Sequence, residues 1–271
     1  MRPTLFMIGS LPVRSYGLML AIGFLIATYV ASYRAEKRGI PSQMIFDLGL
    51  CILVGAVLGA RIFHVLQHPK LYSSFWDFFK VWEGGLAFYG GFILAFGGAF
   101  AYVRWKKLSM GKVADIMAPS LMLGTGIGRI GCFLAGCCFG KPTSLPWGVT
   151  FPEYSAPWLE FGAQKIHPTQ LYSSLDLIGI FVILVVIQKY MKFPWQLFFI
   201  SVIMYAVHRF LIDFLRFYEP TERIGGLATS QVMSIIAAVI SLAMIIFLTV
   251  WHAHDNEPLQ ASQAGKGKKG K

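Results

Sequence analysis

The stretch Ala228–Val250, "ATSQVMSIIAAVISLAMIIFLTV", has no charged side chain over its whole length. About 20 mostly apolar residues are enough to cross the hydrocarbon core of a bilayer as an α-helix. This stretch therefore predicts a membrane-spanning helix, and it sets the fold class: the chain is expected to be an integral membrane protein.

The composition of the whole chain agrees with this prediction. Of 271 residues, 56% are hydrophobic and only 14% are charged, whereas soluble domains have about 25% charged residues. The net charge of +11 does not indicate a nucleic-acid partner, because the basic residues flank apolar segments as membrane topology requires. The first residues lack the pattern of a cleaved signal peptide, so the first span is expected to remain in the mature protein.

Seven apolar segments predict an all-α, polytopic membrane protein with about seven transmembrane helices. The fourth is the weakest, because it is short and contains Asp115 and Pro119. The segments are Tyr16–Tyr33, Met44–Leu66, Leu86–Val103, Val113–Gly128, Leu171–Ile187, Trp195–Leu215 and Ala228–Val250.

Lysine and arginine indicate the orientation, because they gather on the cytoplasmic side of membrane proteins. They are concentrated near residues 34–38, 104–112 and 189–192 and in the C-terminal tail. This predicts a cytoplasmic C-terminus and a periplasmic N-terminus. We expect a membrane domain over residues 1–251, with an outer-face cap within 129–170, and a disordered, basic cytoplasmic tail over 252–271.

Arg61, Arg129 and Arg209 lie within or at the end of predicted spans. An arginine at the bilayer centre costs at least about 2.5–3.5 kcal/mol, so such residues are usually functional. The predicted topology brings all three, with Tyr16 and Tyr89, to one depth in the outer leaflet, which is the pattern of a site. For Arg61, snorkelling or structural pairing explains the position equally well.

Tyr205, Arg209 and Asp213 recur every four residues and therefore share one helical face. Asp213 can pair with Arg209 across one turn and so neutralise and orient its guanidinium. His208 points to another face and is expected to be a packing histidine.

Arg129 lies in the glycine-rich stretch "GRIGCFLAGCCFGKP", residues 128–142. Glycines let the backbone approach other helices or a ligand closely, and a planar guanidinium suits phosphate. A phospholipid is therefore the expected substrate, although a glycine-rich packing seam without chemistry explains the pattern almost as well.

The same stretch holds Cys132, Cys137 and Cys138, whose C-x4-C-C spacing is not a standard zinc pattern. Buried small residues, a disulfide, and a catalytic or metal role all stay open, and no metal site is predicted. His167 precedes a proline and is a general base, a helix cap or a scaffold residue.

Seven short motifs, taken in order, resemble those of bacterial prolipoprotein diacylglyceryl transferases nearly end to end. They are "RSYGLM" (14–19), "GARIFHVL" (59–66), "WEGGLAFYGG" (82–91), "GRIG" (128–131), "HPTQLY" (167–172), "YAVHRFLIDFLR" (205–216) and "GLATSQ" (226–231).

This resemblance implies a reaction: transfer of diacylglyceryl from phosphatidylglycerol to the lipobox cysteine thiol of a prolipoprotein signal peptide, with release of glycerol phosphate. It implies no cofactor and no nucleic acid, and a bacterial inner membrane location with the active site toward the periplasmic leaflet. The implied catalytic residues are Arg129, Arg209, Tyr89 and His167. The implied substrate-binding residues are Arg129, Tyr16, Tyr205, Asp213, Arg61 and Gly131.

The sequence also departs from the family pattern. Asparagine is common in the family where this chain has Cys132 and Ala135, glutamate where it has Cys137, and histidine in some members where it has Tyr89. A tyrosine, with a reference pKa near 10, is a poorer base for the incoming thiol at neutral pH, so Tyr89 and His167 both stay open for that role.

Two other functions remain open. One is a phosphatidylglycerol-dependent transferase with another acceptor. The other is a small anion transporter. This function stays open because three acidic residues are predicted nearer the inner half of the membrane, namely Asp47, Asp115 and Asp176.

Overall fold

The computed structural model describes residues 3–9, 11–72, 74–80, 84–219 and 223–266. Trp82 and Glu83 of the "WEGGLAFYGG" motif lie outside these residues. The elements in chain order are β1 (Thr4–Ile8), β2 (Leu11–Arg14), α1 (Ser15–Glu36), α2 (Ser42–Gln67), η1 (Pro69–Leu71), η2 (Phe75–Phe79), α3 (Phe88–Trp105), α4 (Met110–Ala135), α5 (Ala156–Phe161), α6 (Thr169–Ile187), η4 (Gln188–Tyr190), α7 (Gln196–Ile212), β3 (Arg223–Ile224), β4 (Leu227–Ala228) and α8 (Thr229–Lys266).

Each of the seven predicted spans falls on one α-helix: α1, α2, α3, α4, α6, α7 and α8. Five of these helices are long and apolar enough to cross a membrane, namely α1, α2, α4, α6 with its following turn, and α8 as far as Ala253. The remaining two are shorter, with 18 residues in α3 and 17 in α7. The chain is therefore a mostly helical protein of multi-pass membrane type, and the count of seven crossings and the orientation stay predictions.

The prediction of a short fourth span was wrong. Helix α4 has 26 residues and continues beyond the predicted end at Gly128 to Ala135. Asp115 does not weaken it, because its carboxylate accepts hydrogen bonds from the backbone N–H groups of Trp195 (2.9 Å) and Phe198 (2.8 Å). These groups are the unpaired donors at the start of α7, so Asp115 caps a helix far away in sequence.

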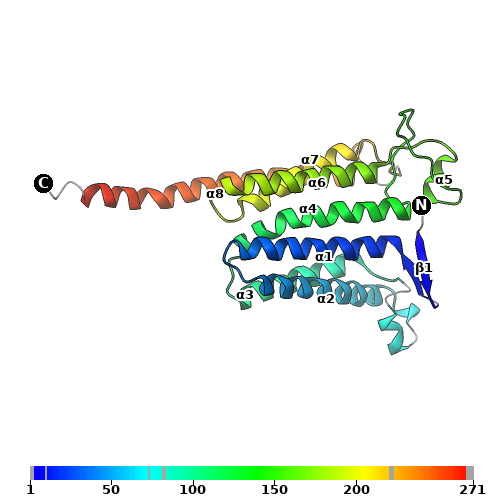
Figure 1. The fold of residues 1–271 in the computed structure, drawn as a ribbon, viewed down its shortest axis with the longest axis horizontal. Coiled ribbons are helices and arrows are strands. Elements are labelled where there is room, and N and C mark those ends of the chain that lie inside the picture. Colours follow the sequence, from blue (N-terminus) through cyan, green and yellow to red (C-terminus); the bar gives the residue numbers. More distant parts are fainter. Residues whose placement is uncertain (1–2, 10, 73, 81–83, 220–222, 267–271) are drawn as a thin grey trace.

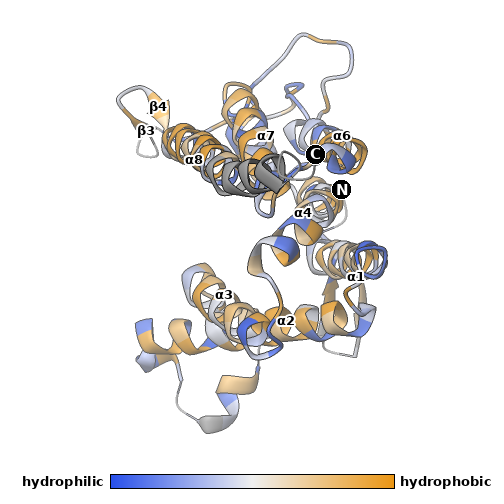
Figure 2. Ribbon diagram, turned by 90° about the vertical axis from the view of Figure 1, so that its left-hand side faces the viewer, coloured by the Kyte–Doolittle hydropathy of each residue, from blue (hydrophilic) through white to orange (hydrophobic). Residues whose placement is uncertain are grey.

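The helices follow one another in space as a curved row, with α4 at its centre (Figures 1 and 2). Helix α2 packs against α3, α1 against α4, α4 against α6, and α7 against α8. One apolar core joins α1, α2, α3 and α4 around Ile45, Leu48 and Ile116, and a second joins α6 and α7 around Leu177, Leu184 and Leu197.

Large apolar side chains also cover the outside of the helices. Leu25, Phe92 and Val239 are each exposed by 60% or more in the isolated chain. So large an apolar surface indicates contact with lipid instead of water.

One end of the row carries the predicted site residues. There α1 and α6 begin, α4 and α7 end, and the connection from Gly136 to Pro168 with α5 covers them (Figure 1). This connection occupies most of the predicted cap segment. At the other end α8 continues to Lys266, whereas the sequence predicts a disordered tail from residue 252; no side chain beyond Ala253 is described, and the tail stays a prediction.

Candidate active site

A cavity of about 550 Å³ opens between α1 and α4 at the end of the molecule that carries the predicted site. Its polar end holds Tyr16, Arg129 and the three cysteines, and Phe88 of α3 contributes to its wall. From there an apolar wall follows both helices for several turns. That wall consists of Leu20, Phe24, Ala27, Leu121, Gly124 and Thr125.

Arg129 lies at the polar end of this cavity, within α4 and not at its end as the sequence predicts. Tyr205 of α7, Cys132 and Cys138 lie close enough to its guanidinium to interact with it electrostatically. The structure therefore brings three of the predicted residues together, because Tyr16 of α1 lines the same cavity as Arg129.

Gly131 explains how α1 reaches this position. A Cβ atom at Gly131 would lie 2.9 Å from Cβ of Met19 and 3.2 Å from Cα of Tyr16. The missing side chain lets the backbones of α1 and α4 meet, which places Tyr16 beside Arg129. In this structure Gly131 is buried against α1, so it acts on the site through helix packing.

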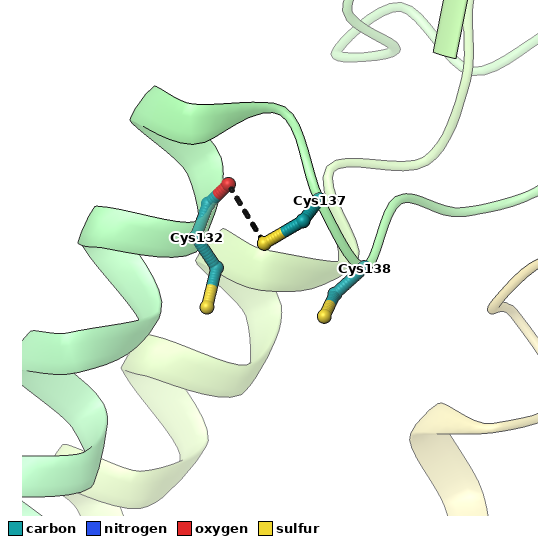
Figure 3. Close-up of side chains that lie close together, drawn as sticks. All are labelled: Cys132, Cys137 and Cys138. Atoms are coloured by element: carbon teal, nitrogen blue, oxygen red, sulfur yellow. Dashed lines mark hydrogen bonds between the residues drawn. The ribbon is translucent and has the colours of Figure 1, made fainter. Parts of the chain in front are cut away.

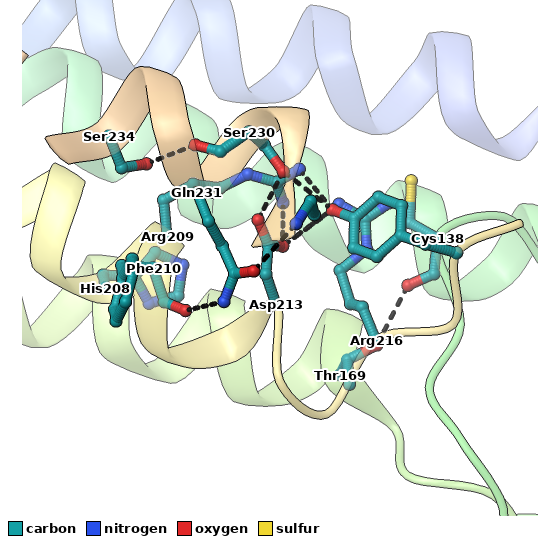
Figure 4. Close-up of polar contacts among 12 residues, drawn as sticks. Cys138, Thr169, His208, Arg209, Phe210, Asp213, Arg216, Ser230, Gln231 and Ser234 are labelled. Carbon is teal, nitrogen blue, oxygen red and sulfur yellow. Dashed lines mark hydrogen bonds and ion pairs between the residues drawn. The ribbon is translucent and has the colours of Figure 1, made fainter. Parts of the chain in front are cut away.

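The predicted pairing of Arg209 with Asp213 is confirmed: Arg209 Nη1 lies 3.2 Å from Asp213 Oδ1. The carboxylate of Asp213 is fully buried, and Figure 4 shows it at the centre of a polar cluster. Tyr218 accepts a hydrogen bond from Arg209 Nη2 (2.8 Å) and donates one to Asp213 Oδ1 (2.7 Å). Arg209 is thus fixed in orientation at the end of α7.

The sequence analysis did not identify three members of this cluster, namely Arg216, Tyr218 and Ser230. Ser230 Oγ donates to Asp213 Oδ2, and Arg216 Nη1 lies 3.9 Å from Asp213 Oδ1. The signal for Arg216 was its spacing of three residues from Asp213, but α7 ends at Ile212 and helical spacing does not apply beyond it. Tyr218 and Ser230 had no such signal, because the loop after α7 and the start of α8 bring them there.

The charge of this region favours an anion. Among the described salt bridges, Arg209 and Arg216 share one carboxylate, Asp213, so positive charge is left over there, and Arg129 adds to it at the polar end of the cavity. In Tyr218, which lies in the loop after α7, burial raises the pKa, and the hydrogen bond to Asp213 raises it further; these effects outweigh the lowering by Ser230, Arg216 and Arg209, so the hydroxyl remains a neutral donor.

The three cysteines meet where α4 ends. Figure 3 shows their side chains gathered around the turn, and their Sγ atoms lie within 4.8 Å of one another. The pKa of the Cys138 thiol is lowered, first by hydrogen bonding with Cys132 and Cys137 and then by the nearby Arg216 and Arg129. All four cysteines of the chain are free thiols in the structure.

Arg61 is placed as a structural residue. Its side chain is almost fully buried, and its guanidinium donates to the backbone carbonyls of Phe78 (2.8 Å), Gly84 (2.6 Å) and Gly85 (3.1 Å). These bonds fasten the connection between α2 and α3. These contacts fit the alternative in which Arg61 has a structural pairing role. With these bonds made, its guanidinium is not free to bind phosphate.

Tyr89 and His167 lie at the same end of the molecule as Arg129, but neither lines its cavity. Tyr89 is 71% exposed in the first turn of α3 and stays outside the cavity, whose wall includes its neighbour Phe88. His167 is half-buried, with Nδ1 3.5 Å from the Tyr172 hydroxyl, and burial lowers its pKa. Its backbone carbonyl accepts from Gly140 N (3.2 Å), so it positions the loop that follows the cysteines.

The three acidic residues that the sequence predicts nearer the inner half have structural partners, and for Asp176 the predicted position was wrong, because it lies in the first half of α6, nearer the site end. Asp115 caps α7, Asp47 accepts from Gln43 (2.8 Å) and Tyr102 (3.2 Å), and Asp176 lies 3.1 Å from the ring of His208. His208 is buried as predicted for a packing histidine.

Two comparisons with known proteins agree with this geometry. The family model for prolipoprotein diacylglyceryl transferase matches residues 3–247. A Clostridium tetani protein named phosphatidylglycerol–prolipoprotein diacylglyceryl transferase is 35% identical over 243 residues, covering 89% of this chain and 96% of its own. A Thermotoga maritima protein of the same name is 34% identical over 247 residues, covering 90% of this chain and 84% of its own. The motifs in their order, the arginine-lined cavity and these matches lead to one conclusion: the chain belongs to the prolipoprotein diacylglyceryl transferase family.

Proposed function

We propose that this protein transfers the diacylglyceryl group of phosphatidylglycerol to the cysteine thiol of a prolipoprotein. The single observation that carries the proposal is the cavity that joins Arg129 to an apolar wall along α1 and α4. Such a cavity is complementary to a molecule with one anionic end and long apolar chains. The names of the family and of its relatives supply the donor and the acceptor.

The phosphate of the lipid would lie against Arg129, with Tyr16 and Tyr205 beside it. A guanidinium can donate two parallel hydrogen bonds to phosphate, which fixes the position of the group as well as its charge. Arg209, held by Asp213, would add positive charge on the α7 side. The acyl chains would follow the wall formed by Leu20, Phe24 and Leu121.

The reaction is a substitution at carbon. The acceptor thiolate attacks the glyceryl carbon that bears the phosphate ester, the new bond is C–S, and the C–O bond to phosphate breaks. Glycerol phosphate leaves with the bonding electron pair. Arginines aimed at the phosphate stabilise the charge that develops on it, and such preorganised groups are often the largest single contribution to catalysis.

The acceptor is proposed to be the lipobox cysteine of a prolipoprotein signal peptide. The location is proposed to be the bacterial inner membrane, with the site toward the periplasmic leaflet and the N-terminus on the same side. The support is that the basic connections lie at the opposite end from the cavity, as expected for the cytoplasmic end. The donor lipid would enter from the leaflet beside α1 and α4.

The test is release of glycerol phosphate by the purified protein from phosphatidylglycerol vesicles with a lipobox peptide. We expect release to require the peptide cysteine, so that a serine peptide gives none. Arg129→Ala should lower kcat/KM at least about hundredfold, the loss typical of one oxyanion-stabilising donor. Arg104→Ala, at the opposite end of α3, is the matched control and should retain activity.

Equal release with the serine peptide would show a different acceptor. Full activity of a folded Arg129→Ala protein would remove Arg129 from the phosphate site and overturn the proposed binding mode.

A further inference from the structure

The cluster Cys132, Cys137 and Cys138 has a geometry that the transfer reaction described above does not use. All three Sγ atoms lie within 4.8 Å of one another (Figure 3), and all three residues line the same cavity as Arg129. In a tetrahedral site with Zn–S bonds of about 2.3 Å, sulfur atoms are about 3.8 Å apart. The sulfur atoms therefore need to move by only about 1 Å to share one ion.

The backbone folds the cysteines together in two steps. Gly136 ends α4 with a φ of +81°, and the N–H of Cys137 then donates back to the carbonyl of Cys132 (3.2 Å). Cys138 follows with a φ of +62°, a conformation that residues other than glycine seldom adopt. Such strain persists only where the surroundings enforce it, and it is frequent at functional sites.

Helix α6 holds this turn in place from the other side. Thr169 Oγ1 donates to the carbonyl of Cys138 (2.9 Å), and Gln170 Nε2 donates to the carbonyl of Cys137 (2.8 Å). Thr169 and Gln170 are each only 1% exposed. The two loop cysteines are thus fixed through their backbones, while Cys137 Sγ donates to the Cys132 carbonyl (3.8 Å) and all three Sγ atoms lie within 4.8 Å of one another.

The surrounding charge suits three thiolates around one divalent ion. Such a unit carries a net negative charge, and the guanidinium groups of Arg129 and Arg216 both interact with Cys138. A disulfide would use only two of the three sulfur atoms, and adjacent Cys137 and Cys138 are poorly placed to bridge to each other. Three converging sulfur atoms therefore favour a metal ion over a disulfide.

We propose that Cys132, Cys137 and Cys138 bind one thiophilic divalent ion of the zinc class, with a fourth coordination position open to the cavity. This revises the sequence-based prediction of no metal site, because the C-x4-C-C spacing becomes a ligand set only through the turn at Gly136. Three protein ligands and one open position are characteristic of catalytic zinc sites.

The open position suits the acceptor thiol, and this part of the inference rests on the proposed function. The sulfur of the incoming cysteine would bond to the ion, its S–H bond would break, and the proton would leave to water. Metal coordination deprotonates thiols outright. The ion would thereby do the work for which Tyr89, exposed and outside the cavity, is poorly placed.

The experiment uses cobalt(II) with the full chain, reduced and kept free of oxygen in detergent. Cobalt(II) bound to thiolates absorbs in the near ultraviolet, and its visible bands report tetrahedral coordination. We expect one equivalent to bind, and each of Cys132→Ser, Cys137→Ser and Cys138→Ser to lose the thiolate band. Cys51→Ser, which removes the free cysteine of α2, is the matched control and should keep it. Cys137 is exposed, so its substitution is the variant least able to disturb folding.

A lipobox peptide is then added to the cobalt protein. We expect the cysteine peptide to shift the visible bands and the serine peptide to leave them unchanged. Absence of a thiolate band, or an equal band in folded Cys137→Ser, would overturn the metal site. A thiol count showing two cysteines missing before reduction would assign a disulfide instead. Identical spectra with both peptides would overturn the open position, whereas failure of the proposed function would appear separately, as no glycerol phosphate release.

Discussion

At the scale of single residues, Asp213 is held by several partners at once. It receives hydrogen bonds or ion pairs from Arg209, Arg216, Tyr218 and Ser230, and its carboxylate is fully buried. The two arginines are themselves mostly buried. Removing the charge of Asp213 would leave them without a counterion in a region of low dielectric.

We therefore predict that Asp213→Asn lowers the free energy of unfolding by about 3–5 kcal/mol, as expected when one partner of a buried ion pair is lost. Thermal and denaturant unfolding in detergent measure this loss. Asp176→Asn is the control, because Asp176 has a 59% exposed side chain and one partner, His208, among the described contacts. A similar effect of both substitutions would show that burial of Asp213 is not the cause.

His167 gives a prediction about pH. Burial lowers its pKa below the ordinary value of 6.5, so the unfolded chain binds a proton more readily than the folded protein. Stability should be fully present above pH 6.5 and should fall as the pH drops through 6.5 toward the lowered pKa.

The measurement is the unfolding midpoint at pH 7.5 and pH 5.5. We expect the difference between the two midpoints to shrink in His167→Gln and to be unchanged in His68→Gln, which removes an exposed histidine. An unchanged difference in His167→Gln would show that other groups cause the pH dependence.

At the scale of elements, close contacts between helix backbones decide which side chains meet. Helices α2 and α3 touch at Gly59 and Gly90, where an added Cβ at Gly90 would lie 2.2 Å from Cβ of Phe63 and 2.3 Å from the carbonyl oxygen of Gly59. Helix α3 also contains Gly97, and a Cβ atom added at Gly97 would have no neighbouring atom within 4 Å. Two glycines in one helix thus have different reasons to be there.

Gly90→Ala is predicted to destabilise the protein by about 1–3 kcal/mol, the usual cost of overpacking. Gly97→Ala is predicted to be neutral or to stabilise by up to about 1 kcal/mol, because alanine is the better helix former. Unfolding midpoints of the two variants, compared with the unmodified protein, test this. A loss of stability in Gly97→Ala as large as in Gly90→Ala would contradict the packing argument.

At the scale of the whole molecule, the cavity exists only because α1, α3, α4 and the loop after α4 come together. Its apolar wall lies on the two helices that form the α1–α4 pair, and its polar end faces α7. The length of this wall should therefore influence which acyl chains the protein accepts.

We predict that Thr125→Phe, which fills the apolar part of the cavity, weakens use of long-chain phosphatidylglycerol more than of a short-chain analogue. Each methylene kept out of an apolar site forfeits about 0.8 kcal/mol. The KM for both lipids is the measurement. Leu25→Phe is the control, since Leu25 lies on the exposed side of α1 and does not line the cavity. Equal effects on both lipids would show that the chains bind elsewhere.

Some of this protein follows from the sequence alone, because apolar length and helical spacing are local properties. The run Ala228–Val250 predicts α8, and the spacing of Arg209 and Asp213 predicts their ion pair, which the structure confirms. The motifs, in their order, predict the family. Each of these conclusions depends on residues that are neighbours in the chain or on one helical face.

What only the tertiary structure decided depends on contacts between distant segments. The carboxylate of Asp115 is satisfied within α4 because it caps α7. The guanidinium of Arg61 is bound by backbone carbonyls of the following loop, and Tyr218 and Ser230 reach Asp213 through a turn and another helix. The spacing of the three cysteines does not show that their sulfur atoms meet, because the turn at Gly136 and the hydrogen bonds from α6 bring them together. Spacing along a sequence cannot reveal such groupings, because the direction of the chain after a helix ends is set by the packing of the elements around it.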